Sequence, residues 1–131
     1  MKVKLRSGDT LDHFIGSNLK GQSIELGNGP AVSPMESVLM SIAACSTIDI
    51  VLILEKMRQK VENIEVEVDG TRNEEHPKVF TEVTVKYILT GQIKTEKLEE
   101  AIRLSLDKYC SVSMMIAKTA KITSSYEIKN I

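Results

Sequence analysis

Two cysteines, Cys45 and Cys110, are the residues of this sequence best suited to do chemistry. A thiolate can attack a peroxide oxygen to give a sulfenic acid, and a second thiol within reach can condense with that acid to form a disulfide. The two residues are far apart in the sequence and match neither a C-x-x-C motif nor a zinc-ligand spacing. Two cysteines are also too few for the disulfide framework of a secreted domain. If the thiols act together, the fold must bring them together.

Each cysteine also has a plain structural interpretation. Cysteine is among the most often buried residue types. Ala43, Ala44 and Ser46 surround Cys45 with small side chains that would let two helices approach closely. Cys45 is expected beyond the first turn of its helix, where the helix dipole has faded, so a cation would have to stabilise its thiolate. A pair of inert, buried cysteines therefore stays open as an interpretation.

The helix that carries Cys45 has three agreeing start signals. Ser33 suits the N-cap, Pro34 suits the first helical position, and Glu36 suits the third, where it completes a capping box. We expect this helix to run to about Gln59, and its apolar residues cover nearly every direction. One small chain cannot cover such a helix on all sides. The pattern therefore predicts an obligate homodimer, in which the central helices pack together and sheets from both chains enclose them.

The remaining elements must position the two cysteines. Alternating apolar and polar residues predict strands at residues 3–6, 11–15, 23–26, 64–68, 79–89 and 122–128. The strands at 64–68 and 79–89 are expected to form an antiparallel hairpin with a longer loop. A helix capped by Thr95 should end near Cys110, and a short helix should follow within residues 112–120. This order indicates an α+β fold with helices packed on antiparallel sheet, in a single domain over residues 1–131.

Composition narrows the function classes. The chain has 131 residues, of which 42% are hydrophobic and 27% are charged, as in a soluble globular protein. A formal net charge of -1 gives no reason to expect nucleic acid or an anionic membrane as a partner. The start of the sequence does not resemble a signal peptide, and polar residues interrupt its most apolar stretch, so we expect a cytoplasmic protein without a membrane span. His13 and His76 show no metal-ligand spacing.

Three segments resemble the OsmC/Ohr family. Residues 33–46, S-P-M-E-S-V-L-M-S-I-A-A-C-S, resemble its central-helix motif, in which a helix that begins with proline carries a small-small-Cys step. Residues 107–112, D-K-Y-C-S-V, resemble its second cysteine motif. Residues 72–81 are similar to the hairpin of its smaller OsmC-like branch. Together these segments cover most of the chain from Ser33 onward.

The resemblance implies an intertwined two-fold homodimer with a site between the subunits. It also implies a thiol-dependent peroxidase that reduces organic hydroperoxides in oxidative stress defence, with Cys45 as the peroxidatic cysteine and Cys110 as the resolving cysteine. A dithiol, such as a lipoyl group, would reduce the disulfide, and no metal or organic cofactor is implied. In the family an arginine held by a glutamate activates the first cysteine. Glu36 is the candidate for that glutamate, although Met35 occupies the position directly after the proline, where the family usually has it.

The sequence does not place the activating cation. Arg6, Arg72 and Lys108 are candidates, and each has an ordinary interpretation as a solvated or locally paired side chain. Asp49 lies one helical turn after Cys45 on the same helix face, inside an apolar stretch where a carboxylate needs partners. It could hold a cation from the other subunit, or it could make a hydrogen bond at the dimer interface.

Two function hypotheses follow from these observations. The first is the thiol-dependent peroxidase described above, with an apolar pocket that favours organic hydroperoxides. The second is a catalytically inactive protein of the same fold that binds a hydrophobic ligand or a small thiol. The displaced glutamate and the missing arginine favour the second hypothesis, whereas the two cysteine motifs favour the first.

Overall fold

The structure is a computed structural model and describes residues 1–130. In chain order its elements are β1 (Val3–Ser7), β2 (His13–Asn18), β3 (Ser23–Gly27), α1 (Pro34–Lys56), β4 (Lys60–Arg72), β5 (Phe80–Gln92), α2 (Thr95–Leu104), the π-helix η1 (Ser105–Tyr109), α3 (Ser111–Ile116) and β6 (Lys121–Asn130). The chain divides into two compact units, Met1–Val38 and Leu39–Ile131. The expectation of one domain over the whole chain stays a prediction.

The first unit holds the expected N-terminal meander. Strands β1, β2 and β3 pair in that order, and both pairings are antiparallel. Leu5 faces Gly16 across the first pair, and Gly16 faces Ile24 across the second. The second strand begins and ends later than the sequence pattern indicates, at His13–Asn18. The β1 strand, which includes Arg6, is exposed along its whole length.

The second unit is built on a sheet in the order β4, β5, β6. The β4 and β5 strands form the predicted antiparallel hairpin, with Val66 opposite Tyr87. The β6 strand instead pairs parallel to β5, with Tyr126 opposite Tyr87. The expectation of purely antiparallel sheet is therefore wrong here, and the sheet is mixed. The chain leaves β5, passes through α2, η1 and α3, and returns to the same sheet, and a crossover of this length produces a parallel pair.

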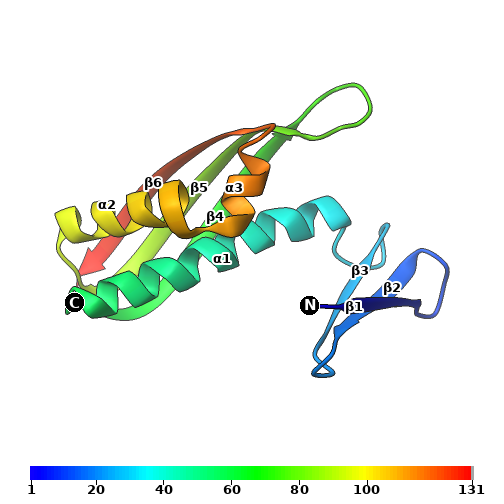
Figure 1. The fold of residues 1–131 in the computed structure, drawn as a ribbon, viewed down its shortest axis with the longest axis horizontal. Coiled ribbons are helices and arrows are strands. Elements are labelled where there is room, and N and C mark those ends of the chain that lie inside the picture. Colours follow the sequence, from blue (N-terminus) through cyan, green and yellow to red (C-terminus); the bar gives the residue numbers. More distant parts are fainter. Residues whose placement is uncertain (131) are drawn as a thin grey trace. The chain divides into compact units, whose positions relative to one another are not determined.

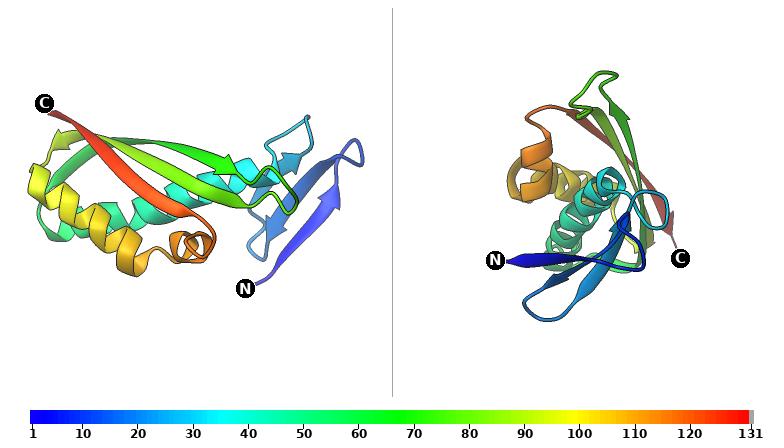
Figure 2. Two further views of the ribbon diagram at one scale, coloured as in Figure 1. Left: turned by 90° about the horizontal axis from the view of Figure 1, so that it is seen from above. Right: turned by 90° about the vertical axis from the view of Figure 1, so that its right-hand side faces the viewer.

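Helices α1, α2 and α3 all lie on one face of this sheet (Figures 1 and 2). Side chains from the helices and the central strand meet there and are almost completely buried, and they include Ile42, Ile50, Leu54, Val83, Val85, Tyr87, Leu89, Leu98 and Ala101. The β5 strand supplies several of them because it is the middle strand of the sheet. Both cysteines lie on the helical layer that packs on this core.

Within the single chain, α1 is covered on one side only. Ile42, Ile50 and Leu54 are fully buried, whereas the opposite stripe is open: Met40 is 57% exposed, Ile48 62% and Leu52 51%. By length and composition alone, α1 could also cross a membrane, and 22% of its most apolar window is buried. The sequence prediction of a helix that is apolar all round is confirmed. The single chain leaves one of its faces without a cover.

The helix before Cys110 differs from the prediction in two ways. Its N-cap is Lys94, which has extended backbone and makes no side-chain capping bond, so Thr95 is already the first helical residue. Its last turn, Ser105–Tyr109, is a π-helix rather than a continuation of the α-helix. Such wide turns occur often at functional sites because they displace the backbone that follows them. Cys110 comes directly after this turn, where the backbone becomes extended.

Candidate functional site

The start of α1 is fixed by the predicted capping box. The Glu36 N–H donates to Ser33 Oγ at 3.2 Å, and the Ser33 N–H donates to Glu36 Oε1 at 3.0 Å. The Ser33 N–H bond holds the pKa of the exposed Glu36 carboxyl below its ordinary value of 4.5. The role of Glu36 as a capping residue is therefore confirmed.

The second unit brings the two cysteines together. Both are free thiols; Cys45 is half-buried and Cys110 is buried. The Cys110 thiol and the Cys45 side chain are hydrogen-bonded, and this bond raises the pKa of Cys110. The raised pKa keeps Cys110 protonated, so its thiol is able to donate to the Cys45 sulfur. The pair predicted from the sequence is in contact before any disulfide forms.

The sulfur of Cys110 also accepts hydrogen bonds from Ser113. The Ser113 hydroxyl donates to Cys110 Sγ at 3.0 Å, and the Ser113 N–H donates to the same atom at 3.4 Å. Burial raises the pKa of Cys110 above its ordinary value of 9.0, and this effect outweighs the two bonds from Ser113, which lower the pKa. On the other side, the Cys110 N–H donates to the Ser105 carbonyl at 2.7 Å, closing the π-turn. Cys110 is thus held by its backbone and by its sulfur.

A buried polar network lies next to the cysteines. The Tyr87 hydroxyl donates to Ser46 Oγ at 2.7 Å, and Ser46 Oγ donates to the Ile42 carbonyl at 2.8 Å. Burial is the main reason that the pKa of Tyr87 rises to about 12. The Ser105 hydroxyl lies 3.1 Å from the Ser46 carbonyl and 3.2 Å from Asp49 Oδ2. Because its single proton can serve only one of these acceptors at a time, Ser105 links α1 to the π-turn by a shared bond.

Sequence reasoning does not identify these serines or the tyrosine as site residues. The alternation of β5 places Tyr87 in the core, and the apolar stripe of α2 includes Ser105, but neither pattern indicates a hydrogen-bond partner. Ser113 follows Cys110 in a C-x-x-S arrangement that is too short to indicate a role by itself. The signal that could identify these serines is chemical, because a serine buried on an apolar helix face needs a hydrogen-bond partner.

Asp49 lines a hollow at the C-terminal half of α1. Its carboxylate accepts from Ser105 within the same chain, so the predicted buried carboxylate does have a partner. The hollow has a volume of about 380 Å³ and is lined by Asp49, Leu52, Ile53, Lys56, Met57, Leu104 and Tyr109. It is largely apolar and adjoins the open stripe of α1.

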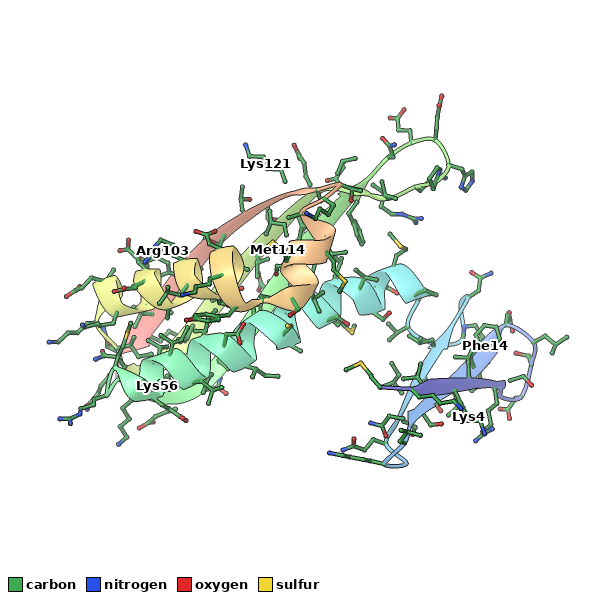
Figure 3. The ribbon with its side chains drawn as sticks, in the orientation of Figure 1. Lys4, Phe14, Lys56, Arg103, Met114 and Lys121 are labelled. Atoms are coloured by element: carbon green, nitrogen blue, oxygen red, sulfur yellow. The ribbon has the colours of Figure 1, made fainter. Side chains whose placement is uncertain are left out.

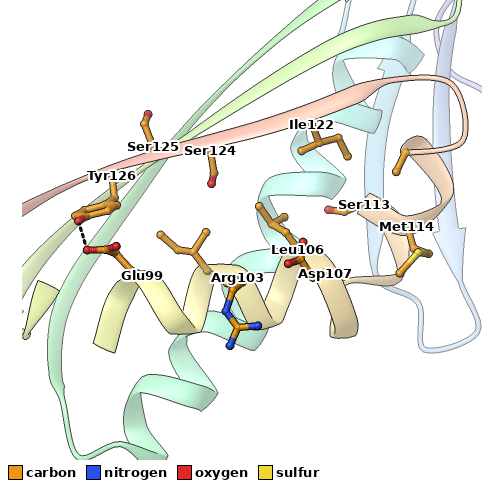
Figure 4. A pocket seen from close by; sticks show the side chains of 12 residues that line it. Glu99, Arg103, Leu106, Asp107, Ser113, Met114, Ile122, Ser124, Ser125 and Tyr126 are labelled. Atoms are coloured by element: carbon orange, nitrogen blue, oxygen red, sulfur yellow. Dashed lines mark hydrogen bonds between the residues drawn. The ribbon is translucent and has the colours of Figure 1, made fainter. Parts of the chain in front are cut away.

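A second hollow, of about 680 Å³, lies between α2, α3 and β6. Figure 3 shows Arg103 on α2 and Met114 on α3, two of its lining residues. In the close view of Figure 4, the Tyr126 hydroxyl donates to Glu99 at 2.9 Å at one end, and Ser113 lies toward the other end, near Leu106. The hollow therefore reaches the residue that contacts the Cys110 sulfur.

Two of the cations considered from the sequence, Arg72 and Lys108, have other contacts. The Arg72 Nε–H donates to the Lys78 carbonyl at 2.8 Å and closes the hairpin loop. The Lys108 ammonium lies 5.2 Å from the centre of the Tyr109 ring. His13 lies 3.8 Å from a carboxylate oxygen of Glu25. Residues 1–130 contain no cluster of three or more metal-ligating side chains that could hold a metal ion.

Comparisons with known proteins agree with this architecture. Residues 27–125 match the family model described as OsmC-like protein. The chain is 44% identical over 119 residues to protein YhfA of Escherichia coli K12, which covers 88% of this chain and 89% of YhfA. A crystal structure of a protein from Aquifex aeolicus VF5 is similar with a TM-score of 0.92 and 35% identity, over 99% of this chain and 96% of that one.

A more distant structure shares the fold alone. An organic hydroperoxide resistance protein OsmC from Legionella pneumophila matches with a TM-score of 0.71 and 17% identity, over 96% of this chain and 95% of that one. The resemblance to the OsmC/Ohr family is confirmed by the family model and by these relatives. The chain belongs to the OsmC-like protein family.

Proposed function

We propose that this protein is a thiol-dependent peroxidase that reduces organic hydroperoxides, with Cys45 as the peroxidatic cysteine and Cys110 as the resolving cysteine. The observation that carries the proposal is that the fold brings the side chains of Cys45 and Cys110 into contact, with Cys45 half-buried and Cys110 buried. Cys45 is the more accessible of the two cysteines, so a peroxide reaches it first. Solved structures of the same fold include organic hydroperoxide resistance proteins, and this supports the choice of substrate.

The chemistry needs two steps on these sulfurs. The Cys45 thiolate attacks one peroxide oxygen, the O–O bond breaks, and the products are a sulfenic acid on Cys45 and an alkoxide that takes a proton from water to become an alcohol. The Cys110 thiolate then attacks the sulfenic sulfur, a disulfide forms, and hydroxide leaves. A dithiol reductant, such as a lipoyl group, would restore both thiols by two exchange steps. No metal or organic cofactor has a part in this cycle.

We further propose that the protein acts as a two-fold homodimer. The exposed stripe of α1 and the adjoining hollow form a continuous apolar surface of a kind that monomers rarely leave open. A second copy of α1 would cover this stripe with an identical one, as two-fold interfaces do. A lipid bilayer suits this surface less well than a second subunit does. The α1 helix also carries Cys45, Ser46 and Asp49, which make polar contacts within the fold. A cytoplasmic location is part of the same proposal.

The second subunit would also supply what the single chain lacks. Burial, Ser113 and Cys45 set the pKa of Cys110, and no lysine or arginine of the described residues is among these causes. We propose that an arginine of the second subunit activates Cys45 and that Glu36, through its Oε2 atom, holds this cation. The Glu36→Gln substitution tests this role because glutamine keeps the capping box but removes the charge.

The reduced protein should be treated with cumene hydroperoxide while peroxide loss is followed in the presence of dihydrolipoamide. We expect consumption over many turnovers, a Cys45–Cys110 disulfide in the mass spectrum, and faster reaction than with hydrogen peroxide. A Cys110→Ser variant should stop at a Cys45 sulfenic acid that dimedone traps, and a Cys45→Ser variant should be inactive. If the wild-type protein forms no disulfide and consumes no peroxide, the peroxidase proposal is wrong.

One observation favours a second candidate function. Arg72 and Lys108, the two candidate cations of the second unit, contact the Lys78 carbonyl and the Tyr109 ring. An inactive member of the fold would use its apolar hollow to bind a hydrophobic ligand or a small thiol instead. Binding of cumyl alcohol or glutathione by calorimetry, in the absence of peroxide consumption, would support this alternative.

A further inference from the structure

A chain of contacts runs from Ser113 through the Cys110 sulfur to Cys45. Ser113 donates twice to the Cys110 sulfur, at 3.0 Å and 3.4 Å, and the Cys110 thiol is in turn in hydrogen-bond contact with the Cys45 side chain. Ser113 and Cys110 are each only 1% exposed, so water cannot take the place of the serine donors. Ser113 has no other described bond from its hydroxyl. Two donors of one residue therefore converge on the sulfur of the resolving cysteine.

We propose that Ser113 is a positioning residue that aims the Cys110 sulfur at Cys45 and stabilises it whenever it carries negative charge. This inference rests on the peroxidase function proposed above and adds a role for a residue outside the cysteine pair. The Cys110 sulfur carries that charge twice in the cycle. It does so as the attacking thiolate that resolves the sulfenic acid, and again as the thiolate that leaves when the disulfide is reduced.

In the resolving step, Cys110 gives up its proton as its sulfur attacks the sulfur of the Cys45 sulfenic acid. The S–O bond breaks, the S–S bond forms, and the departing hydroxide takes up a proton, so that one water molecule is the net product. Burial disfavours the thiolate on Cys110. The two Ser113 donors offset part of this cost, because hydrogen bonds to a charged acceptor are stronger than those to a neutral one.

In the reductive step, an incoming thiolate can attack either sulfur of the disulfide. Attack on Cys45 forms a mixed disulfide there and expels Cys110 as a thiolate, which Ser113 receives with two hydrogen bonds. Attack on Cys110 would require the reductant to reach a residue that is only 1% exposed. Ser113 thus directs the reductant to Cys45, the half-buried sulfur.

The test compares Ser113→Ala and Ser113→Thr with a matched control, Ser111→Ala, on the exposed side of the same helix. After one equivalent of cumene hydroperoxide, we expect Ser113→Ala to form its sulfenic acid at the wild-type rate and its disulfide roughly tenfold more slowly. Its Cys45 should accumulate sulfinic acid, because the unresolved sulfenic acid meets more peroxide. The threonine variant keeps the hydroxyl and should restore resolution, and Ser111→Ala should behave as wild type.

A second arm does not depend on peroxide. Disulfides made with the oxidant diamide are mixed with excess glutathione, quenched in acid after short intervals, and mapped by mass spectrometry. We expect the mixed disulfide on Cys45, formed roughly tenfold more slowly in Ser113→Ala. In the reduced protein, alkylation of Cys110 should shift to higher pH in that variant, a change that a loss of packing alone would not produce.

The outcomes separate the two proposals. If the wild-type protein ignores cumene hydroperoxide but the diamide arm gives the expected pattern, the peroxidase function fails and the role of Ser113 stands. If Ser113→Ala forms and opens its disulfide at wild-type rates, or if the mixed disulfide is found on Cys110, the role of Ser113 is refuted whatever the peroxide result. Should the threonine variant fail to fold, the alkylation profile of Ser113→Ala decides.

Discussion

The hydroxyl of Tyr87, on the central strand of the sheet, donates a 2.7 Å hydrogen bond to the hydroxyl of Ser46, which directly follows Cys45 on α1. Both side chains are fully buried. The Ser46 hydroxyl in turn donates a hydrogen bond to the Ile42 carbonyl, one turn earlier in the helix. The sheet therefore holds the cysteine-bearing turn of α1 through a specific polar bond in addition to apolar packing, and this fixes where the Cys45 sulfur can lie.

Tyr87→Phe should lower the free energy of unfolding by about 1 kcal/mol at neutral pH, because it removes one buried hydrogen bond while Ser46 keeps its bond to Ile42. At alkaline pH the wild-type protein should become less stable than Tyr87→Phe. The raised pKa of Tyr87, about 12 against 10.0, stabilises the fold fully below pH 10, and this contribution is lost as the pH rises toward 12. Denaturant unfolding between pH 8 and about 11.5 should show a steeper loss in the wild-type protein. An equal loss of stability with pH in the two proteins would contradict this prediction.

The capping box at the start of α1 should make its stability depend on acid. Because the folded-state pKa of Glu36 is lowered, its contribution is present above the ordinary value of 4.5 and is lost as the pH falls through the folded-state value. Ser33→Ala removes the partner hydroxyl and should lower the free energy of unfolding by about 1 kcal/mol. Thermal unfolding of Ser33→Ala and Glu36→Gln checks this. The glutamine variant should keep most of the neutral-pH stability and lose the acid dependence.

Local signals made the central helix and the hairpin predictable from the sequence. Ser33, Pro34 and Glu36 are neighbours, so their joint signal needs no tertiary information, and the alternation of β4 and β5 reflects one buried face. The parallel pairing of β6 could not be predicted in this way, since it depends on a crossover through three helical segments. The serine network could not be predicted from the sequence either. Ser105 and Ser46 are 59 positions apart, and each has the pattern of an ordinary small residue in its own segment.

The open stripe of α1 predicts that a charge there will break the homodimer. Leu52→Lys should convert the protein to a monomer of 14.6 kDa, because a two-fold interface places each substitution against its own copy and buries two like charges. Glu55→Lys is the matched control, since it adds the same side chain to an exposed position of the same helix. Sedimentation at micromolar concentration separates the two states. A wild-type protein that sediments as a monomer would refute the dimer itself.

The two cysteines should differ sharply toward an alkylating reagent. Burial raises the pKa of Cys110, which disfavours its reactive thiolate, and the residue is only 1% exposed. The half-buried Cys45 should therefore react first with iodoacetamide, and mass mapping of a brief treatment should find the label there.

Labelling of Cys110 should then follow local opening of the fold and rise with pH, whereas in denaturant both thiols should react alike. A Cys45→Ser variant supplies the control, since Cys110 alone should then remain slow. Faster labelling of Cys110 than of Cys45 in the native protein would mean that the more reactive sulfur is the buried one, and it would reverse the order of attack proposed for the pair.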